Sequence, residues 1–537
     1  MGPASWVVLC HTLRRMAGGA ERTAAERDGS ARSAPADGSE RRRVVLVSFA
    51  VFLLTFLVYW LLGPGQTPYD FQVSQANNLI HGHVDLTVEY TNNLNLVERA
   101  LYDGQGFCVP IDDPRGPDFA KLIDNPRYSA DCREYMVHGF GPSLMLLPLV
   151  ALFGLSVNQV LVSALFGAAA AVIAYAITRR FSSDLRTQLA LTVLAMFGTT
   201  MWYSSADGGA WHFAQAVAAF FLFASIYATL AWRSALLAAV FVGAAFLARP
   251  TTVMGIFFPF VALSGTWLVA GTGTALWRRL RLRPLLELAA GLTPFLLIWA
   301  AANFLRFGSP FETGYTYIEE FHQREGVWLW PPFSPSYIGR HIKIIFEATP
   351  IFSTSGSYIW PSWAGQALWL TSPGLLIGLF AHLKRHRALT AAATVALAIA
   401  ATIIVLIGAG DRLGWTTWSV GTIPLGVHLW PFWLVIGAAI SFAIGLRDRL
   451  VVAAWAAIVP LTLVNWMFTG TGWAQFGYRF ALDFIPYLWL LVVIAVPKLR
   501  WYHAVLIGAS VLVNLWGVLW VEKLGPAQLF GWTWVSY

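Results

Sequence analysis

Asp70 is the side chain of this sequence best placed for chemistry, because it closely follows an apolar span. The first span is predicted at 44–62, and Asp70 comes eight positions later, in the segment PYDFQVSQANNLIHGHVDL. A carboxylate at a bilayer boundary is costly to bury, so its presence there is by default a hypothesis of function. Aspartate is also a common N-cap, and a helix is predicted to begin near Val73. A functional carboxylate and a helix cap are both open roles for Asp70.

Asp207 and His138 are further candidates on the same predicted side of the membrane. Asp207 lies in the short turn SSADGGAWHF between two apolar spans. Asp-Gly-Gly is also ordinary turn chemistry, so a structural role is the alternative. His138 precedes a short apolar stretch at 141–154 and is expected to border a cavity. The neighbouring His212 is expected to be an interfacial histidine and not a ligand.

Membrane helices must position these residues. Of the 537 residues, 57% are hydrophobic and only 12% are charged, and the mean hydropathy of +0.59 excludes an ordinary soluble domain. The apolar runs match the ~20 residues that cross a hydrocarbon core of ~30 Å, where only helices satisfy the backbone in such runs. We predict an all-α polytopic membrane protein. Its spans are expected at 44–62, 158–178, 187–205, 211–231, 234–248, 251–270, 284–305, 366–382, 388–408, 428–445, 450–468, 481–496 and 501–521.

Two loops on one side of the predicted bundle are too long to be simple connectors. The stretch 141–154 within the first of them is too short to cross and is expected to be juxtamembrane or re-entrant. The predicted regions are a disordered basic cytoplasmic tail (1–43), a transmembrane module (44–305) that includes the first outer loop (63–157), a second outer loop (306–365) and a C-terminal transmembrane region (366–537).

Basic residues indicate the orientation of the bundle. With the N-terminus inside, every short cytoplasmic turn is basic, as the positive-inside rule requires, and the C-terminus lies outside. The net charge of +8 is therefore explained by basic cytoplasmic turns that contact membrane lipids. Nucleic acid is not an expected partner. The composition favours a bacterial source, which predicts a multi-pass protein of the bacterial cytoplasmic membrane.

The sequence does not decide whether two of its three cysteines form a disulfide. Cys10 lies in the predicted cytoplasmic tail, whereas Cys108 and Cys132 share the first outer loop. An oxidising compartment would let these two pair. The spacing permits a disulfide and equally permits two thiols.

Four stretches of the chain together resemble one family of membrane enzymes. The segment after the first span ends in a G-H-x-D-L step, and HGFGPSLMLLPLVALFG (138–154), NFLRFGSPFETGY (303–315) and WAQFGYRFALDFIPYL (473–488) follow in order. With the span pattern, most of 44–490 is similar to the GT-C glycosyltransferases, in particular to family 39, the protein O-mannosyltransferases and aminoarabinose-transferase-like enzymes. Many relatives carry a paired Asp-Glu at the catalytic position, whereas here Phe71 follows Asp70.

The resemblance implies a GT-C-type bundle and an inverting single displacement. The donor would be a sugar on a polyprenyl phosphate, and the acceptor would be a hydroxyl of a glycan, a lipid or a protein. Asp70 would be the general base that takes the hydroxyl proton. Asp207 would help to position the acceptor or to tune the phosphate site. The lipid-linked sugar is the substrate, and no cofactor is expected.

The leaving phosphate gains negative charge, so this chemistry needs cations on the outer side. The candidates for binding the donor phosphate are Arg249, Arg340, Lys343 and Arg479. The candidates for binding the sugar or the acceptor are His138, Tyr315, Tyr317, Trp328 and Trp330. Glu319, Glu320 and His322 have a spacing that superficially resembles a metal site. No further ligands complete that site, so a divalent metal is not expected.

Two other classes of protein share parts of this pattern. A multi-span lipid or polysaccharide transporter (or flippase) would also expose long outer loops, but transporters usually place ionisable groups in the middle of their spans. An O-antigen ligase or polymerase would share the lipid-linked donor with a different order of modules. The near absence of charges within the predicted spans favours the glycosyltransferase.

The predicted topology can be tested at Asp70 itself. A single cysteine at position 70 should react with a membrane-impermeant thiol reagent added to intact cells, because the side chain is expected to face the extracytoplasmic side. Labelling only after the membrane has been permeabilised would place Asp70 on the cytoplasmic side and contradict the assignment.

Overall fold

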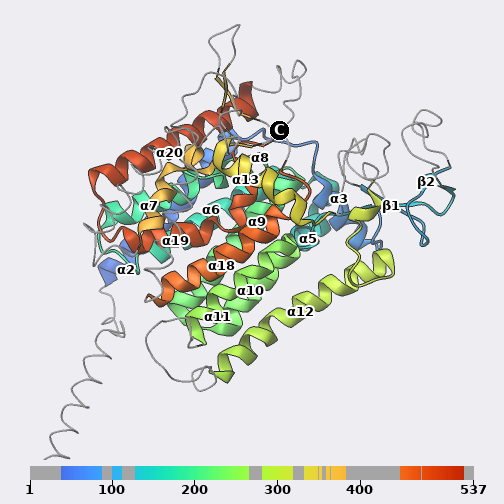
Figure 1. Ribbon diagram of the computed structural model, residues 1–537, viewed down its shortest axis with the longest axis horizontal. Coiled ribbons are helices and arrows are strands. Elements are labelled where there is room, and N and C mark those ends of the chain that lie inside the picture. Colours follow the sequence, from blue (N-terminus) through green and yellow to red (C-terminus); the bar gives the residue numbers. More distant parts are fainter. Residues whose placement is uncertain are drawn as a thin grey trace, which may run out of the picture. The chain divides into compact units, whose positions relative to one another are not determined.

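The computed structural model describes residues 38–86, 99–111, 127–264, 281–318, 332–348, 350–352, 359–362, 365–381, 448–472 and 475–524. The chain divides into two compact units, Met1–Ala50 and Val51–Tyr537. In the first unit the described part is the beginning of helix α2 (Gly38–Leu62). The second unit contains the remaining elements (Figure 1).

The described residues are mostly helical, and six helices are long and apolar enough to cross a bilayer. This agrees with the predicted class of helical membrane protein, and each of the six coincides with a predicted span. The π-helical turns η2 (Ala228–Trp232) and η12 (Trp520–Leu524) extend two of them. The six are α2, α6 (Gln159–Thr178), α9 (Ala210–Tyr227), α12 (Leu282–Phe307), α18 (Arg449–Trp466) and α20 (Trp501–Leu519).

Five further predicted spans form short or interrupted helices, so their crossing of the membrane stays a prediction. Several of these short helices begin with a proline, which lacks a backbone N–H donor and therefore accounts for part of the break in each span. The predicted spans 388–408 and 428–445 lie outside the described residues. The pieces are α7 (Leu185–Phe197) and α8 (Met201–Asp207), α10 (Ala235–Ala248), η3 (Pro250–Ile256) and α11 (Phe257–Leu263), α14 (Leu368–Thr371) and η8 (Pro373–Phe380), and η11 (Arg479–Asp483) and α19 (Ile485–Ala495).

The described part of the first outer loop contains two short α-helices. Helix α3 (Phe71–Ile80) packs against α5 (Gly141–Phe153), and the hydroxyl of Ser143 donates to Oε1 of Gln75 at 2.5 Å. The thirteen residues of α5 extend only about 20 Å at ~1.5 Å per residue. This length agrees with the prediction that the stretch 141–154 is too short to cross a bilayer.

The outer loops also contain short strands, which are local additions to the predicted all-α architecture. β1 (Arg99–Tyr102) pairs antiparallel with β4 (Arg133–Met136), β2 (Val109–Pro110) pairs parallel with β3 (Tyr128–Ser129), and β5 (Ile351–Phe352) pairs antiparallel with β6 (Ile359–Trp360). The apolar pattern that predicts helices cannot predict strands of two to four residues. The second loop also contains η5 (Tyr315–Tyr317), η7 (Pro335–Tyr337) and α13 (Ile338–Glu347).

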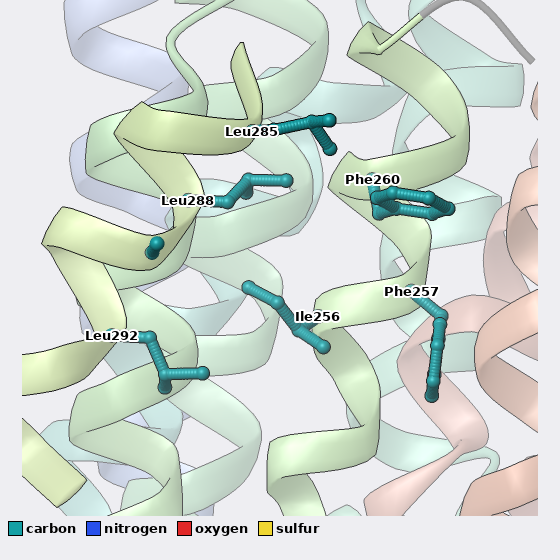
Figure 2. A pocket seen from close by; sticks show the side chains of 7 residues that line it. Ile256, Phe257, Phe260, Leu285, Leu288 and Leu292 are labelled. Atoms are coloured by element: carbon teal, nitrogen blue, oxygen red, sulfur yellow. The ribbon is translucent and has the colours of Figure 1, made fainter. Parts of the chain in front are cut away.

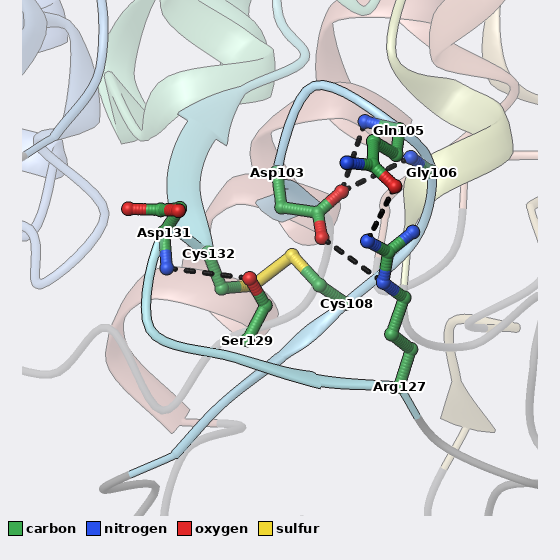
Figure 3. The surroundings of a disulfide bond; sticks show 8 residues. All are labelled: Asp103, Gln105, Gly106, Cys108, Arg127, Ser129, Asp131 and Cys132. Atoms are coloured by element: carbon green, nitrogen blue, oxygen red, sulfur yellow. Dashed lines mark hydrogen bonds and ion pairs between the residues drawn. A yellow bond between two sulfur atoms is a disulfide. The ribbon is translucent and has the colours of Figure 1, made fainter.

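A disulfide joins Cys108 to Cys132, so the pairing that the sequence left open is formed (Figure 3). Beside it, Nε of Arg127 lies 3.2 Å from Oδ2 of Asp103. The Asp103 carboxylate also accepts hydrogen bonds from the backbone N–H groups of Gln105 and Gly106. The disulfide and the Arg127–Asp103 ion pair therefore both join the segment around residues 103–108 to the segment around residues 127–132.

In the described contacts between turns, each turn meets one that is predicted to lie on the same side of the membrane. Two turns predicted to be cytoplasmic meet where Ser182 donates to the carbonyl of Pro497 and the N–H of Leu499 donates to Thr187 Oγ1, both at 2.8 Å. At predicted outer ends, Nζ of Lys523 donates to the carbonyl of Gly63 at 2.7 Å. Which of these ends faces the cytoplasm stays a prediction.

Helices α9, α10 and α12 run side by side (Figure 1). α12 approaches α10 closely at Gly291, where a Cβ would lie 2.6 Å from the carbonyl oxygen of Leu236. Since the obstacle is main chain, it cannot move aside as a side-chain end would. Glycine is therefore required for this helix crossing.

Replacing Gly291 with valine should force α12 away from α10. We expect a loss of about 1–3 kcal/mol in the free energy of unfolding, as is typical of overpacked sites. Gly508→Val is the matched control, because a Cβ at Gly508 meets nothing within 4 Å. Thermal unfolding of the purified protein in detergent measures both. Equal stability of the two variants would contradict the described helix crossing.

Candidate functional site

Asp70 occupies the N-cap position of α3, and the helix begins at Phe71, two residues before the predicted start. The main-chain carbonyl of Asp70 accepts from the N–H groups of Val73 at 3.0 Å and Ser74 at 3.4 Å. Its side chain makes no capping hydrogen bond. Asp70 therefore stands at the cap position that the alternative expected, but its carboxylate does not make the hydrogen bond of a side-chain cap.

The turn after α8 is held against the segment that carries Asp70. The side-chain amide of Gln159 donates to the carbonyl of Gly208 at 2.8 Å and to that of Tyr69 at 3.3 Å. The side-chain amide of Gln72 donates to the carbonyl of Ala210 at 2.7 Å. Both glutamines are buried. These bonds join the residues next to Asp70 to the residues that follow Asp207.

Trp211 is the side chain around which the candidate residues gather. Its ring lies 5.2 Å from that of Tyr69 and 6.2 Å from that of Phe71, the two neighbours of Asp70. The His138 ring packs edge-on against it at 5.6 Å. Three segments that the sequence analysis selected separately are thus brought together. Trp211 itself was not selected.

The half-buried Asp207 forms a polar cluster with the buried His212 and the half-buried Glu522. Its Oδ1 accepts from the N–H of Gly209 at 2.8 Å, and Gly208 adopts φ +65°, so the predicted turn is present. The same Oδ1 lies 2.6 Å from Nδ1 of His212. The carboxyl group of Glu522 also hydrogen-bonds to Asp207. Two carboxyl groups form such a bond only when one of them carries a proton.

Arg479 continues this cluster on the far side of His212. Its Nη1 lies 3.4 Å from Nε2 of His212, and its main chain is held by Gln475 and Gln215. A guanidinium can only donate, so Nε2 accepts and the imidazole proton resides on Nδ1, toward Asp207. The side chains therefore form a line from carboxylate through neutral imidazole to guanidinium. Asp207 and Arg479 at the ends of this line were predicted site residues, whereas His212 was expected to be an interfacial histidine.

Arg249 is already engaged with a carboxylate. Its Nε and Nη2 donate to the two oxygens of Asp483 at 2.7 and 3.0 Å, and Thr251 and Asn465 donate to the same group. Asp483 is 1% exposed. Arg249 and Arg479 both lie over the Phe480 ring, at 5.1 and 5.6 Å. The structure thus brings these two predicted phosphate ligands together, with the Arg249 charge balanced by a residue that the sequence analysis did not select.

The other predicted cations, Arg340 and Lys343, lie one turn apart on α13. Arg340 donates through Nη2 to the carbonyl of Thr469 and lies over the Tyr337 ring. Between them, His341 contacts the hydroxyl of Tyr478 and the carbonyl of Phe468, each at 2.8 Å. α13 is thereby fastened to the segment that leads into Arg479.

The predicted sugar-binding aromatics are only partly described. Tyr317 stacks on Tyr102 with ring centroids 4.5 Å apart, and Tyr315 packs edge-on against Phe468 at 5.6 Å. Trp328 and Trp330 lie outside the described residues, as do Glu319, Glu320 and His322. Within the part of the chain that the structure describes, no group of three or more His, Cys, Asp or Glu could hold a metal ion.

Comparison of the chain with known protein families, with curated proteins and with solved structures found no match. The resemblance to the GT-C glycosyltransferases therefore rests on the quoted motifs and stays a prediction. Any function must therefore be inferred from the arrangement of the site residues.

His341 should make the stability of this region depend on pH. Burial lowers its pKa from 6.5 to about 4, against the opposing hydrogen bond to the Phe468 carbonyl. Between pH 6.5 and 4 the unfolded chain therefore binds a proton that the folded chain does not, so stability falls as the pH falls through this window. We expect the unfolding temperature to drop between pH 7.5 and 5.

His341→Gln should be less stable at pH 7.5 but should lose less on acidification than the wild type. The exposed His81 supplies the control, and His81→Gln should keep the wild-type slope. Thermal unfolding at a series of pH values measures all three proteins. Parallel pH profiles for wild type and His341→Gln would rule out His341 as the group responsible.

Proposed function

We propose that the chain is a GT-C-type membrane glycosyltransferase. It transfers a sugar, with inversion, from a polyprenyl-phosphate donor to an acceptor hydroxyl at the extracytoplasmic face. One observation carries the proposal: a half-buried carboxylate at Asp70 and a buried guanidinium at Arg479 belong to segments that converge on the turn between Asp207 and His212. Inverting transfer from a phosphate needs a base and a cation in one site.

The reaction assigns one task to each charged group. The acceptor oxygen attacks the anomeric carbon, Asp70 takes the proton of that hydroxyl, and the bond from the anomeric carbon to the phosphate oxygen breaks. The lipid leaves as a phosphate monoester with one more negative charge. Arg479 stabilises that charge because a buried cation acts through a low effective dielectric. His212 acts as a positioning residue, because it lies between Arg479 and Asp207.

The location of ionisable residues supports an enzyme over a transporter or flippase. In the six long apolar helices, Asp, Glu, Lys and Arg lie only near the ends; examples are Arg306 in α12 and Glu522 in the extension of α20. A pathway through the membrane usually requires such groups in the middle of helices. An O-antigen ligase or polymerase remains the alternative within the lipid-dependent enzymes, and its acceptor distinguishes it.

The setting of the proposed reaction is a bacterial cytoplasmic membrane, with a cytoplasmic N-terminus. The carbonyls, hydroxyls and aromatic rings of the outer loops would meet the acceptor, whether it is a glycan, a lipid or a protein. Tyr315 and Tyr317 lie next to the β1–β4 sheet and remain the described candidates for this contact. The identity of the sugar is left to experiment.

Asp70→Asn should reduce turnover by about 10²–10⁴-fold, the usual contribution of a general base. The amide keeps the size of the side chain but cannot take the proton. The assay is transfer of labelled sugar from polyprenyl phosphate in proteoliposomes, with acceptor extracted from the source membrane. Asp131→Asn is the matched control, an exposed carboxylate of the same loop, and it should keep wild-type turnover. Wild-type turnover by Asp70→Asn would remove the proposed mechanism.

A further inference from the structure

Helix α12 changes character along its length. Near its start it borders an apolar cavity of about 260 Å³, between Leu288 on its own surface and Phe260 on α11 (Figure 2). The aliphatic and aromatic side chains that line this cavity offer no hydrogen bond to a polar substrate. Near the other end of α12, Arg306 is 6% exposed and donates three hydrogen bonds. A polar role for α12 is therefore expected at the end that carries Arg306.

The Arg306 guanidinium joins α12 to the segment that contains His138. Its Nη1 donates to the carbonyl of Met136 at 2.7 Å, and its Cζ lies 5.0 Å from the centre of the Phe140 ring. These contacts lie two residues before and two residues after His138, whose ring packs against Trp211. Because one planar group holds both ends of this short stretch, the direction of the His138 side chain is restricted.

Helix α10 contacts the same segment. A Cβ on Gly141 would lie 2.6 Å from the backbone nitrogen of Ala248, and a Cβ on Gly139 would collide with the Ala248 carbonyl oxygen. Both obstacles are main chain, so they cannot move aside as a side-chain end would. The segment around His138 is therefore held by the end of α10 as well as by Arg306.

The same guanidinium is tied to the second outer loop. Its Nη2 donates to Oδ1 of Asn303 at 2.6 Å, and Nδ2 of Asn303 donates to the carbonyl of Pro310 at 3.4 Å. The guanidinium also lies over the adjacent Phe307 ring at 5.1 Å, and that ring packs against Tyr317 at 5.7 Å. Arg306 thus reaches both stretches of the chain that carry the described candidates for acceptor binding.

The chemistry of arginine explains why this residue type is found here. A planar guanidinium presents several N–H donors in fixed directions and can stack on aromatic rings, whereas the ammonium of lysine is a single point charge. Nε of Arg306 donates to the carbonyl of Ala302 at 3.2 Å in the last turns of α12, where the helix dipole favours a cation. The charge is therefore accommodated at this helix end, and the hydrogen bonds fix the geometry around it.

We propose that Arg306 is a positioning residue of the acceptor subsite, which fixes His138 on one side and the loop of Tyr317 on the other. This role rests on the proposed function, because it assigns His138 and Tyr317 to the acceptor. Arg306 acts through these side chains, since it is buried and its N–H groups are donated to carbonyl and amide oxygens. Its loss should therefore weaken acceptor binding and leave the chemical step unchanged.

The first test needs no substrate. Diethyl pyrocarbonate modifies accessible imidazoles, and peptide mass spectrometry of the purified full-length protein reports each histidine separately. Arg306→Lys should raise the modification rate of His138 about threefold or more, because local opening of its segment becomes easier. His503 on α20 is the internal control, since both histidines are 8% exposed, and its rate should not change. Unchanged modification of His138 would overturn the proposal.

The second test is transfer of labelled sugar in proteoliposomes, with a varied amount of the membrane extract that supplies the acceptor. Arg306→Lys should raise the half-saturating amount of extract about tenfold, the effect of losing roughly one hydrogen bond, at an unchanged maximal rate. Combined with His138→Gln, it should raise that amount by less than the product of the two single effects, because both act in part through one side chain. Arg283→Lys, at an exposed position of the same helix, should keep wild-type values.

Gly139→Ala supplies a second variant, because it presses on the same segment from α10. It should raise both the modification of His138 and the half-saturating amount of extract. Gly106→Ala should change neither, since a Cβ there meets nothing within 4 Å. Thermal unfolding shows which variants are folded, and Gly139→Ala decides the matter where Arg306→Lys is not.

Two results of the transfer assay would overturn the proposal. One is a lower maximal rate of Arg306→Lys at an unchanged half-saturating amount, and the other is an effect that multiplies fully with that of His138→Gln. Absence of transfer by the wild type would instead overturn the proposed function. The modification of His138 would then still decide whether Arg306 fixes that side chain.

Discussion

The side-chain amide of Gln159 is the interaction on which the arrangement of the site depends. It donates to one carbonyl from the segment before Asp70 and to another from the turn after Asp207. Buried carbonyls are costly to leave without donors, so one amide satisfies two of them and holds two segments together. Gln72 repeats the arrangement one residue beyond the turn, at Ala210. Since both donors come from neutral side chains, they fix the geometry without adding charge.

Arg249 and Arg479 both contact the Phe480 ring, but they differ in their charged partners. Arg249 forms a bidentate pair with Asp483, and such a pair is best regarded as a device that holds α10 and η11 together. Arg479 instead lies behind a neutral imidazole that separates it from Asp207. A phosphate that approached Arg479 would meet a cation whose field is only partly cancelled. The two arginines that contact one aromatic ring thus differ in how far their charge is balanced.

The sequence predicted the long apolar helices and the residues at their ends, because length and composition alone determine whether a helix can cross a bilayer. It could not predict the partners. His212 and Arg479 are 267 positions apart, and Glu522 reaches Asp207 from the end of α20. The position of Glu522 and Lys523 directly after an apolar span was a usable signal, similar to that of Asp70. The interrupted helices and the short strands escaped prediction for another reason: hydropathy reports burial and does not report backbone geometry.

The contact between Lys523 and Gly63 joins the last described helix to the end of the first. A chain made on the ribosome inserts its N-terminal elements well before residue 523 emerges. Asp207 and His212 are therefore in place for some time before the carboxyl group of Glu522 reaches Asp207. The polar cluster is completed only by the last described helical turn, so a partly translated chain lacks one of its three acidic and imidazole groups.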